Sequence, residues 1–165
     1  MNQEEILNRM KELLPEDTII SSELFRDQMV MTVKSEHILK VCETAKNDPE
    51  LAFDFLSFVA GVDRFPSTPR FEVVYQIYSM KKNHRFRIKC MLEEPPEGLP
   101  RIDSVVGVWP TADWHERETA EMFGIVFNNH PDPRKLLLPD HWKVYPLRKD
   151  FPLEGSETDT PDLPQ

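Results

Sequence analysis

FEVVYQIYSMKKNHRFRIKCML, residues 71–92, is the stretch of sequence that decides the fold. Apolar and polar side chains alternate in both halves, which is typical of β strands that lie with one face on a core. The polar residues 81–83 between the halves supply the connection of a hairpin. We therefore expect two antiparallel strands with Phe86, Ile88 and Cys90 pointing inward. Their outer face should carry a cationic stripe made of Arg85, Arg87 and Lys89.

The residues before this hairpin predict two helices and three further strands. Asn2 and Glu5 have the spacing of a capping box before apolar residues at helical intervals. Ser35 starts a second helical pattern, and the β-branched and aromatic runs between and after the helices are typical of strands. The expected elements are helices over 2–14 and 35–47 and strands over 18–25, 28–33 and 53–62.

After the hairpin, residues 93–100 hold three prolines and a glycine and are expected to form a loop. Asp103 or Ser104 is then a candidate cap for a short helical turn that runs to Trp109. A third helix is expected from the candidate cap Thr111 through residue 123, because a glycine, the usual helix-ending residue, follows it.

The chain is thus predicted to have an α+β fold, a two-layer α/β domain with a mixed sheet covered by helices. This domain is expected over residues 1–125. Residues 126–165 are expected to form an extended, proline-rich C-terminal segment that packs on the domain and on a partner subunit.

Composition excludes several classes of protein. The 165-residue chain has 20 basic and 29 acidic residues, a formal net charge of −9, which disfavours nucleic acid as a partner. No apolar run is long enough to span a membrane. The two cysteines, Cys42 and Cys90, are far apart in apolar contexts and are expected to be buried thiols.

Motifs for independent chemistry are missing. His115-Glu116 begins like the HExxH zinc motif, but Thr119 stands where the second histidine is needed. Two distant thiols cannot ligate an iron–sulfur cluster, and no nucleotide loop or nucleophile motif is present. We therefore expect no catalytic, cofactor-binding or metal-ligating residue.

Charges and aromatic residues gather instead from Trp114 onward. In the helix that contains it, Glu116, Arg117 and Glu118 do not keep to one face, so some charge must meet protein. One explanation is a set of intramolecular ion pairs that fix the following loop. The alternative is a recognition edge for another subunit, for which aromatic and arginine enrichment is typical.

The same residues resemble a known family. WHERETAEMFGI (114–125), HPD (130–132), RKLLLPD (134–140), Trp142 and PLRKDFPL (146–153) closely resemble the signature of the respiratory complex I thirty-kilodalton-subunit family. The match is dense over about forty residues in fixed order and spacing. Pro133 stands where the family often has leucine, and Val144-Tyr145 stand where it often has Gly-His.

The resemblance implies an accessory, structural subunit without a redox centre, in the quinone module of the peripheral arm of NADH-quinone oxidoreductase. Its expected partners are the hydrogenase-like large subunit, of the D type, and other peripheral-arm subunits. FMN, iron–sulfur clusters and quinone are expected in those partners, and the enzyme activity belongs to the assembly, which transfers electrons from NADH to quinone and translocates protons. The resemblance places the chain on the cytoplasmic side of the cell inner membrane, without a direct membrane span.

The resemblance also gives the residues expected at the interface. Trp114, Phe123 and Trp142 are expected to be packing anchors, and Arg148, Lys149 and Asp150 to make polar contacts across the interface. The full set of signature positions is Trp114, Glu116, Arg117, Glu118, Met122, Phe123, Gly124, His130, Pro131, Arg134, Pro139, Trp142, Arg148, Lys149 and Asp150.

Two alternatives stay open. One is the equivalent subunit of a related complex, because the same domain type occurs in nickel–iron membrane hydrogenases, formate hydrogenlyase and the dehydrogenase of the reduced deazaflavin coenzyme. A free-standing enzyme using His115, Glu118 and His130 for acid–base chemistry is the other. The tail from Glu154 is short and acidic, which limits any longer C-terminal wrap.

Overall fold

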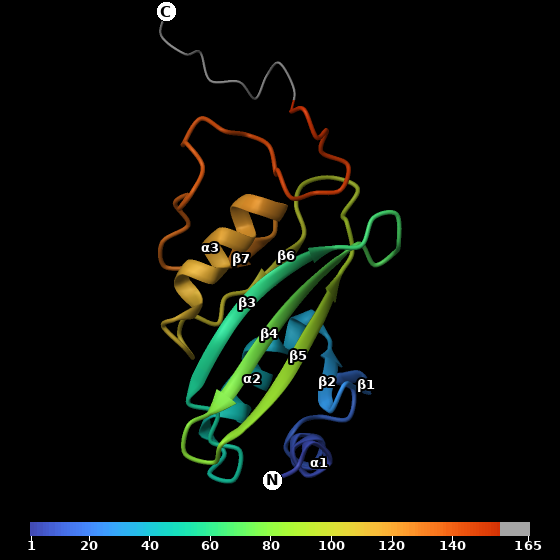
Figure 1. Cartoon of the computed structure of the whole chain (residues 1–165), viewed down its shortest axis with the longest axis vertical. Helices are drawn as coiled ribbons and strands as arrows, with labels where there is room; N and C mark the ends of the chain where they lie inside the picture. Colours follow the sequence, from blue (N-terminus) through green and yellow to red (C-terminus); the bar gives the residue numbers. More distant parts are fainter. Residues whose placement is uncertain (156–165) are drawn as a thin grey trace, which may run out of the picture.

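A mixed five-stranded sheet forms the centre of the structure, a computed structural model that describes residues 1–155 (Figure 1). Its strand order is β1-β2-β5-β4-β3, and only β2 and β5 are parallel neighbours. The strands are β1 (Ile19–Phe25), β2 (Gln28–Val33), β3 (Phe55–Asp63), β4 (Phe71–Ser79) and β5 (His84–Leu92).

The hairpin predicted over residues 71–92 is confirmed. β4 and β5 pair from Phe71 opposite Leu92 to Ser79 opposite His84. The apolar side chains of one face are fully buried, whereas Arg85 is exposed and Arg87 and Lys89 are half-buried on the other. The outward cationic stripe is therefore also confirmed.

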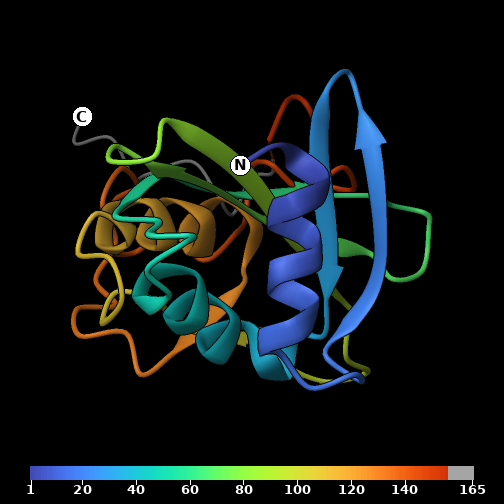
Figure 2. The same cartoon turned by 90° about the horizontal axis from the view of Figure 1, so that it is seen from below.

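Three helices lie on one face of the sheet (Figure 2). They are α1 (Gln3–Leu13), α2 (Ile38–Asn47), which follows the short 3₁₀ helix η1 (Ser35–His37), and α3 (Ala112–Phe123). The predicted capping box is present: the Asn2 side chain accepts from the Glu5 amide, and the Glu5 side chain accepts from the Asn2 amide. The predicted α+β class, with a mixed sheet and helices, is confirmed.

The helices and the inner face of the sheet enclose a single apolar core. Its largest fully buried side chains include Tyr75, Phe53, Phe71 and Phe86. Cys42 and Cys90 are free and buried as expected, and burial raises the pKa of both thiols.

Two short strands were not predicted. β6 (Arg101–Asp103) and β7 (Val126–Asn128) pair in parallel as a separate two-stranded sheet. Asp103 is therefore a strand residue rather than a helix cap. Ser104 instead accepts from the Val106 amide at 3.2 Å and starts the predicted turn. Three-residue strands carry too little alternation to be recognised.

Other boundaries also differ from the expectation. β3 begins at Phe55 rather than at residue 53, because the Phe53 amide donates to the carbonyl of Ala45 at the end of α2. Thr111 precedes α3 as predicted, but its side chain does not cap the helix. The Thr111 hydroxyl donates to the Leu56 carbonyl at 3.4 Å and so ties the start of α3 to β3.

Gly61 allows α3 to lie directly on β3. A Cβ atom at this position would come within 2.7 Å of the Phe123 ring and 2.9 Å of the Thr119 methyl group. Contacts this short do not occur between packed atoms, so any larger residue would push the helix away.

The chain beyond β7 has no helix or strand as far as the structure describes it. Residues 129–155, here called the C-terminal segment, run past α3 and then past one end of the sheet (Figure 1, orange to red). The predicted acidic tail residues Glu157, Asp159 and Asp162 lie outside the described residues. Within residues 1–155, none of the helices has the length and apolar character that crossing a membrane requires.

Candidate functional site

The C-terminal segment is attached to the domain through buried polar side chains of α3 and of the sheet. Most of these contacts are made to backbone groups of the segment, which has no hydrogen-bonding ladder of its own. We call the contact region between residues 129–155 and the rest of the domain the seam. It is the candidate site, and it contains most of the predicted interface residues.

Glu116 lies at the inner end of the seam and is completely buried. Its Oε1 accepts a hydrogen bond of 2.7 Å from the Val105 amide, whereas Oε2 has no hydrogen-bond partner among the described residues. Burial raises the pKa of Glu116 to about 7, opposed by hydrogen bonds from Ser104 and Val105 and increased by the Asp113 carboxylate. Glu116 therefore joins the turn before α3 to the helix.

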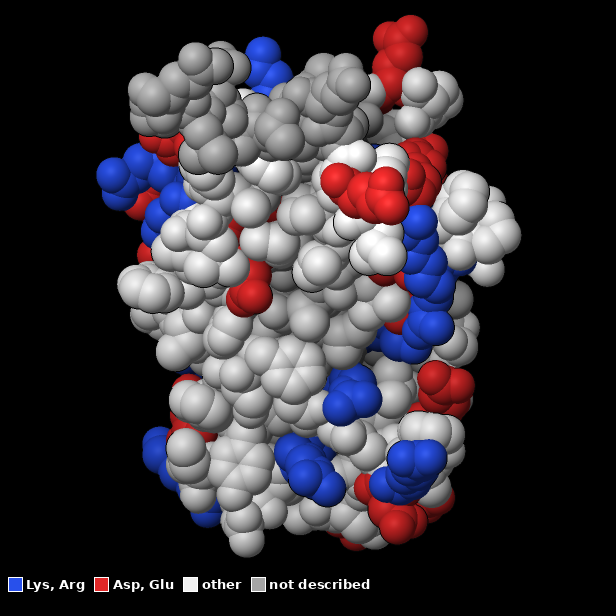
Figure 3. Space-filling model, turned by 45° about the horizontal axis from the view of Figure 1, so that its top comes forward, with Lys and Arg blue, Asp and Glu red and all other residues white. Residues whose placement is uncertain are grey.

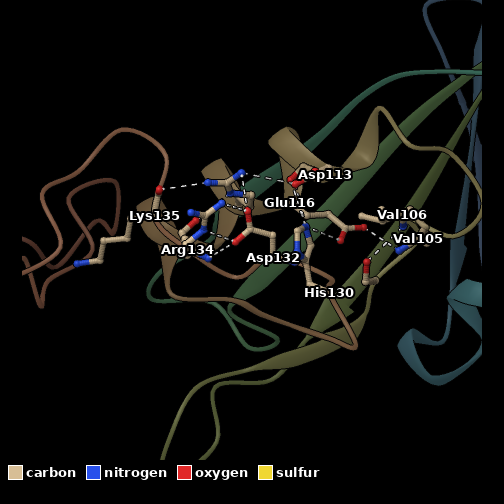
Figure 4. A network of polar contacts seen from close by, with 10 residues as sticks. Val105, Val106, Asp113, Glu116, His130, Asp132, Arg134 and Lys135 are labelled. Carbon is tan, nitrogen blue, oxygen red and sulfur yellow. Dashed lines mark hydrogen bonds and ion pairs between the residues drawn. The ribbon is translucent and has the colours of Figure 1, made fainter.

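His130 packs over Glu116 and brings the C-terminal segment to the start of α3 (Figure 4). Its Nε2 lies 3.2 Å from the Asp113 carbonyl, 3.6 Å from the Asp113 carboxylate and 3.8 Å from Glu116 Oε2. The Asp132 amide donates to Nδ1 at 3.0 Å, so in the neutral ring the proton is assigned to Nε2. The imidazole N–H then points at the acidic groups of α3.

Arg117 holds the next part of the segment. Its guanidinium donates to the carbonyls of Arg134, at 2.8 Å, and Lys135, at 3.3 Å. It also lies 3.5 Å from the Asp132 carboxylate, whose pKa is lowered mainly by hydrogen bonds from Arg134. Arg134 itself is exposed and binds Asp132 with two hydrogen bonds.

Glu121 binds three successive backbone amides of the segment. Its two carboxylate oxygens accept from the amides of Leu136, Leu137 and Leu138 at 3.0, 2.8 and 3.2 Å. The side chain is buried, so these bonds replace the water that its charge would otherwise require. Further along, Lys135 donates to the carbonyls of Pro139, Asp140 and Trp142 and closes this turn on itself.

Gly124 lets the segment return across the end of α3. It has a φ of 70°, and a Cβ atom there would lie 2.7 Å from the Tyr145 ring and 2.8 Å from the Arg148 guanidinium. The Arg148 Nε donates to the Phe123 carbonyl at 2.7 Å, and its guanidinium stacks on the rings of Phe71 and Tyr145. Glycine therefore satisfies both the left-handed backbone and the close approach.

Arg70 is the centre of the last anchoring cluster, at the start of β4. Two of its nitrogens bind the Asp63 carboxylate at 3.0 and 2.9 Å, and it also contacts Glu94 at 2.9 Å and Asp150 at 2.8 Å. Burial opposes ionisation of Asp63, but hydrogen bonds from Arg70 and from the backbone lower its pKa to about 2. This cluster receives residues 148–150 of the C-terminal segment.

A pocket of about 230 Å³ remains between α3, β7 and the C-terminal segment. Its wall combines apolar side chains such as Ile125 and Phe127 with Glu116, Glu121 and His130. This volume is below the usual size of ligand sites. Among residues 1–155, no three His, Cys, Asp or Glu side chains gather as they would around a metal ion. The expected lack of a cofactor in this chain stays a prediction.

The predicted interface residues divide into two groups. One group lies inward, along the seam: Glu116, Arg117, Met122, Phe123, Gly124, His130, Trp142 and Arg148. The other is exposed: Trp114, Glu118, Pro131, Arg134, Pro139, Lys149 and Asp150.

Arg148 and Asp150 were expected to reach across an interface, but their side chains bind Phe123, Glu94 and Arg70 of the same chain. Lys149 donates through its backbone amide, while its side chain is exposed. Intramolecular ion pairs, one of the two explanations for the mixed charges of α3, are present at Arg117. Contacts of all these residues with another subunit stay a prediction.

Three anchoring residues, Asp63, Arg70 and Glu121, were absent from the predicted set. A signal existed for the first two, because Asp63 ends a mainly apolar strand and Arg70 directly precedes the next strand. Glu121 shares its helix stripe with Arg117 and an exposed Glu118, and nothing local distinguishes it from a solvated carboxylate.

The family profile and the relatives with known names point to the same family. The sequence profile described as "Respiratory-chain NADH dehydrogenase, 30 Kd subunit" matches residues 31–157. A C-type subunit of the NADH-quinone oxidoreductase of Rhizobium meliloti (strain 1021), numbered C 2, is 50% identical over 123 residues, which cover 74% of this chain and 65% of that protein. The C-type subunit from Roseiflexus sp. (strain RS-1) is 41% identical over 152 residues, covering 92% and 85%.

A solved structure shares the fold. A chain from the membrane-bound sulfane sulfur reductase, an archaeal respiratory membrane complex, superposes with a TM-score of 0.71 at 22% identity, covering 91% of this chain and 85% of that one. The chain spans only about two-thirds of the Rhizobium relative that it matches. The profile nevertheless covers most of the domain and all of the described C-terminal segment. The chain belongs to the 30-kilodalton-subunit family of the respiratory-chain NADH dehydrogenase.

Proposed function

We propose that this chain is a cofactor-free accessory subunit in the quinone module of a proton-translocating NADH-quinone oxidoreductase. Its role is structural: it presents a folded C-terminal segment to the hydrogenase-like large subunit and adjoining peripheral-arm subunits. FMN, the iron–sulfur clusters and the quinone are held by those partners. The complex works at the cytoplasmic side of the inner membrane, where this chain has a peripheral position.

The observation that carries this proposal is that side chains of the family signature on α3 bind the backbone of the C-terminal segment. Arg117 binds carbonyls of the segment, and Glu121, which lies in the same family run 114–125, binds its amides, so both side chains hold the segment in one conformation. Fixing an irregular segment costs conformational entropy, roughly 1 kcal/mol or more for each residue. That cost has a purpose if the fixed segment is a binding surface, since preorganisation favours association.

The outer side of the same region provides apolar contacts for a partner. Trp114 on α3 and the segment residues Leu137 and Leu147 expose 65%, 61% and 56% of their surface. Large exposed side chains on an ordered segment are typical of subunit interfaces. The relatives that are named as C-type subunits of NADH-quinone oxidoreductase support the identity of the complex.

A related complex is the second candidate, because the fold also occurs in the archaeal sulfane sulfur reductase. A nickel–iron hydrogenase, formate hydrogenlyase or a reduced-deazaflavin dehydrogenase would use the same domain with a different electron donor. Purifying the complex from its own cells decides between them. A co-purifying flavin-binding subunit supports NADH, whereas a large subunit with nickel-ligating cysteine pairs supports a hydrogenase.

Arg117→Ala tests the structural role. Loss of the guanidinium frees the carbonyls of residues 134 and 135, so we expect a lower yield of assembled complex. Complex that does assemble should keep its flavin and iron–sulfur signals and its quinone reduction. Arg101→Ala, which removes an exposed arginine of β6, is the matched control and should leave the yield unchanged. Full yield of Arg117→Ala complex with quinone reduction lost would contradict a purely structural role.

A further inference from the structure

One face of the five-stranded sheet is not covered by any described helix. All three helices lie on the opposite side, as Figure 2 shows. The sheet register places alternate residues of β3, β4 and β5 on the uncovered side. We call this surface the open face, and define it by Phe55, Phe58, Ala60, Val62, Glu72, Val74, Gln76, Tyr78, Arg85, Arg87, Lys89 and Met91.

The part of the open face on β3 and β4 is mainly apolar. Ala60 pairs with Val74, Phe58 pairs with Gln76, and Phe55 pairs with Tyr78 at the end of the ladder. The aromatic side chains are partly accessible, and Phe55 exposes 38% of its surface. A sheet face that remains in water usually carries polar residues at alternate positions, so this composition is typical of a covered face.

The part on β5 carries positive charge that the chain itself neutralises only at one end. Lys89 lies 3.5 Å from Glu72 and 3.8 Å from Glu23. The Arg87 Nε donates to the side-chain oxygen of Gln76 at 3.0 Å, which leaves its charge uncompensated. Among residues 1–155, neither Arg85 nor Arg87 has a carboxylate within 4.0 Å, and the same holds for Lys81 and Lys82 in the adjoining turn.

This cluster is unusual in a chain with a formal net charge of −9. Figure 3 shows separate basic side chains on the lower part of a surface that is mostly uncharged. Arginines beside tyrosine and phenylalanine are the combination that dominates binding energy at protein interfaces. A complementary surface would be apolar opposite β3 and β4 and would carry carboxylates opposite Arg85 and Arg87.

We propose that the open face docks a second polypeptide of the same complex, through an apolar surface of that partner bordered by aspartate or glutamate side chains. This inference rests on the proposed function and adds a second contact to it, separate from the C-terminal segment. A second copy of this chain is disfavoured as the occupant, because a two-fold contact through this face would bring like charges together. An anionic lipid surface is disfavoured because the net charge of the whole chain repels it.

Charge reversal in the assembled complex tests the electrostatic half of the proposal. Arg85→Glu changes an exposed side chain, so the fold is expected to persist. We expect this chain to dissociate from the complex about ten times more readily than the wild type, with a larger effect for Arg85→Glu combined with Arg87→Glu. Lys40→Glu, an exposed change on α2, is the matched control and should have no effect. Unchanged dissociation of both arginine variants would overturn the proposal.

Photo-crosslinking identifies the occupant. A photoreactive residue in place of Val74, with one in place of Lys40 as control, is introduced into the full chain and irradiated in the purified complex. We expect a crosslink from position 74, and not from position 40, to a peptide of another subunit that contains acidic residues. Crosslinks only to a second copy of this chain, only to lipid, or to nothing would each overturn the proposal.

These results are separable from a failure of the proposed function. If the chain purifies with an NADH-quinone oxidoreductase but position 74 gives no crosslink, the docking face is wrong and the structural role remains. If the chain purifies with no respiratory complex at all, the proposed function itself fails.

Discussion

Asp63, the last residue of β3, accepts a hydrogen bond of 2.8 Å from the backbone amide of Lys149, 86 positions further along the chain. The same carboxylate binds two nitrogens of Arg70, so one buried group joins β3, β4 and the C-terminal segment. The path of the segment past the sheet therefore depends on a charge cluster in the domain.

Arg70→Ala should destabilise the chain strongly. Asp63 would remain buried without its cation, and breaking a buried ion pair by removing one partner costs about 3–5 kcal/mol. Arg70→Lys should lie between this variant and the wild type, because lysine keeps the charge but not the two-nitrogen geometry. Urea unfolding of the full chain measures both, with exposed Lys40→Ala as a control expected to change the unfolding free energy by less than about 0.5 kcal/mol. Wild-type stability of Arg70→Ala would contradict the role of the cluster.

Glu121→Gln should loosen the turn at residues 136–138. The amide side chain has one acceptor oxygen instead of two and no charge, so at least one of the three backbone amides loses its partner. Hydrogen exchange at Leu136, Leu137 and Leu138 is expected to become at least about tenfold faster, corresponding to roughly 1.4 kcal/mol. Glu118→Gln makes the same chemical change at an exposed position of α3 and should leave these amides unaffected. Equal exchange in both variants would show that Glu121 does not hold the turn.

Glu116→Gln should change how stability depends on pH. The pKa of Glu116 in the folded chain is raised to about 7, so its contribution is fully present below its ordinary pKa and is lost as the pH rises through 7. Glutamine stays neutral and avoids this loss, which amounts to about 3 kcal/mol for a shift of this size. Unfolding free energies from pH 5 to pH 8 should therefore rise for the variant relative to the wild type. A constant difference over that range would mean that Glu116 does not titrate there.

Gly124→Ala should displace the segment from the end of α3. The new methyl group would meet the Tyr145 ring at 2.7 Å and the Arg148 guanidinium at 2.8 Å, at a backbone conformation that alanine rarely adopts. We expect a loss of more than about 1 kcal/mol of stability and faster hydrogen exchange at residues 145–148. Gly107→Ala meets no atom within 4 Å and is the matched control. Similar behaviour of the two variants would contradict the close approach at Gly124.

The regular elements were predictable from the sequence because their signals are local. Alternation over residues 71–92 gave both strands of the central hairpin and its outward cationic stripe, and the Asn2–Glu5 spacing gave the first helix with its cap. The family followed from the dense run of residues that begins at Trp114. The strands β6 and β7 escaped prediction because each has only three residues.

The roles of the charged residues were decided by the tertiary structure. Sequence alone placed Arg148 and Asp150 at an interface, but it did not indicate that their side chains would bind groups of the same chain. For Arg117 it left intramolecular contacts and a partner contact open, and the structure shows the intramolecular ones. It selected Glu118, which is exposed, and passed over Glu121, which binds three amides. A pattern along the chain fixes which face a side chain takes, whereas its hydrogen-bond partners depend on segments brought together from many residues away.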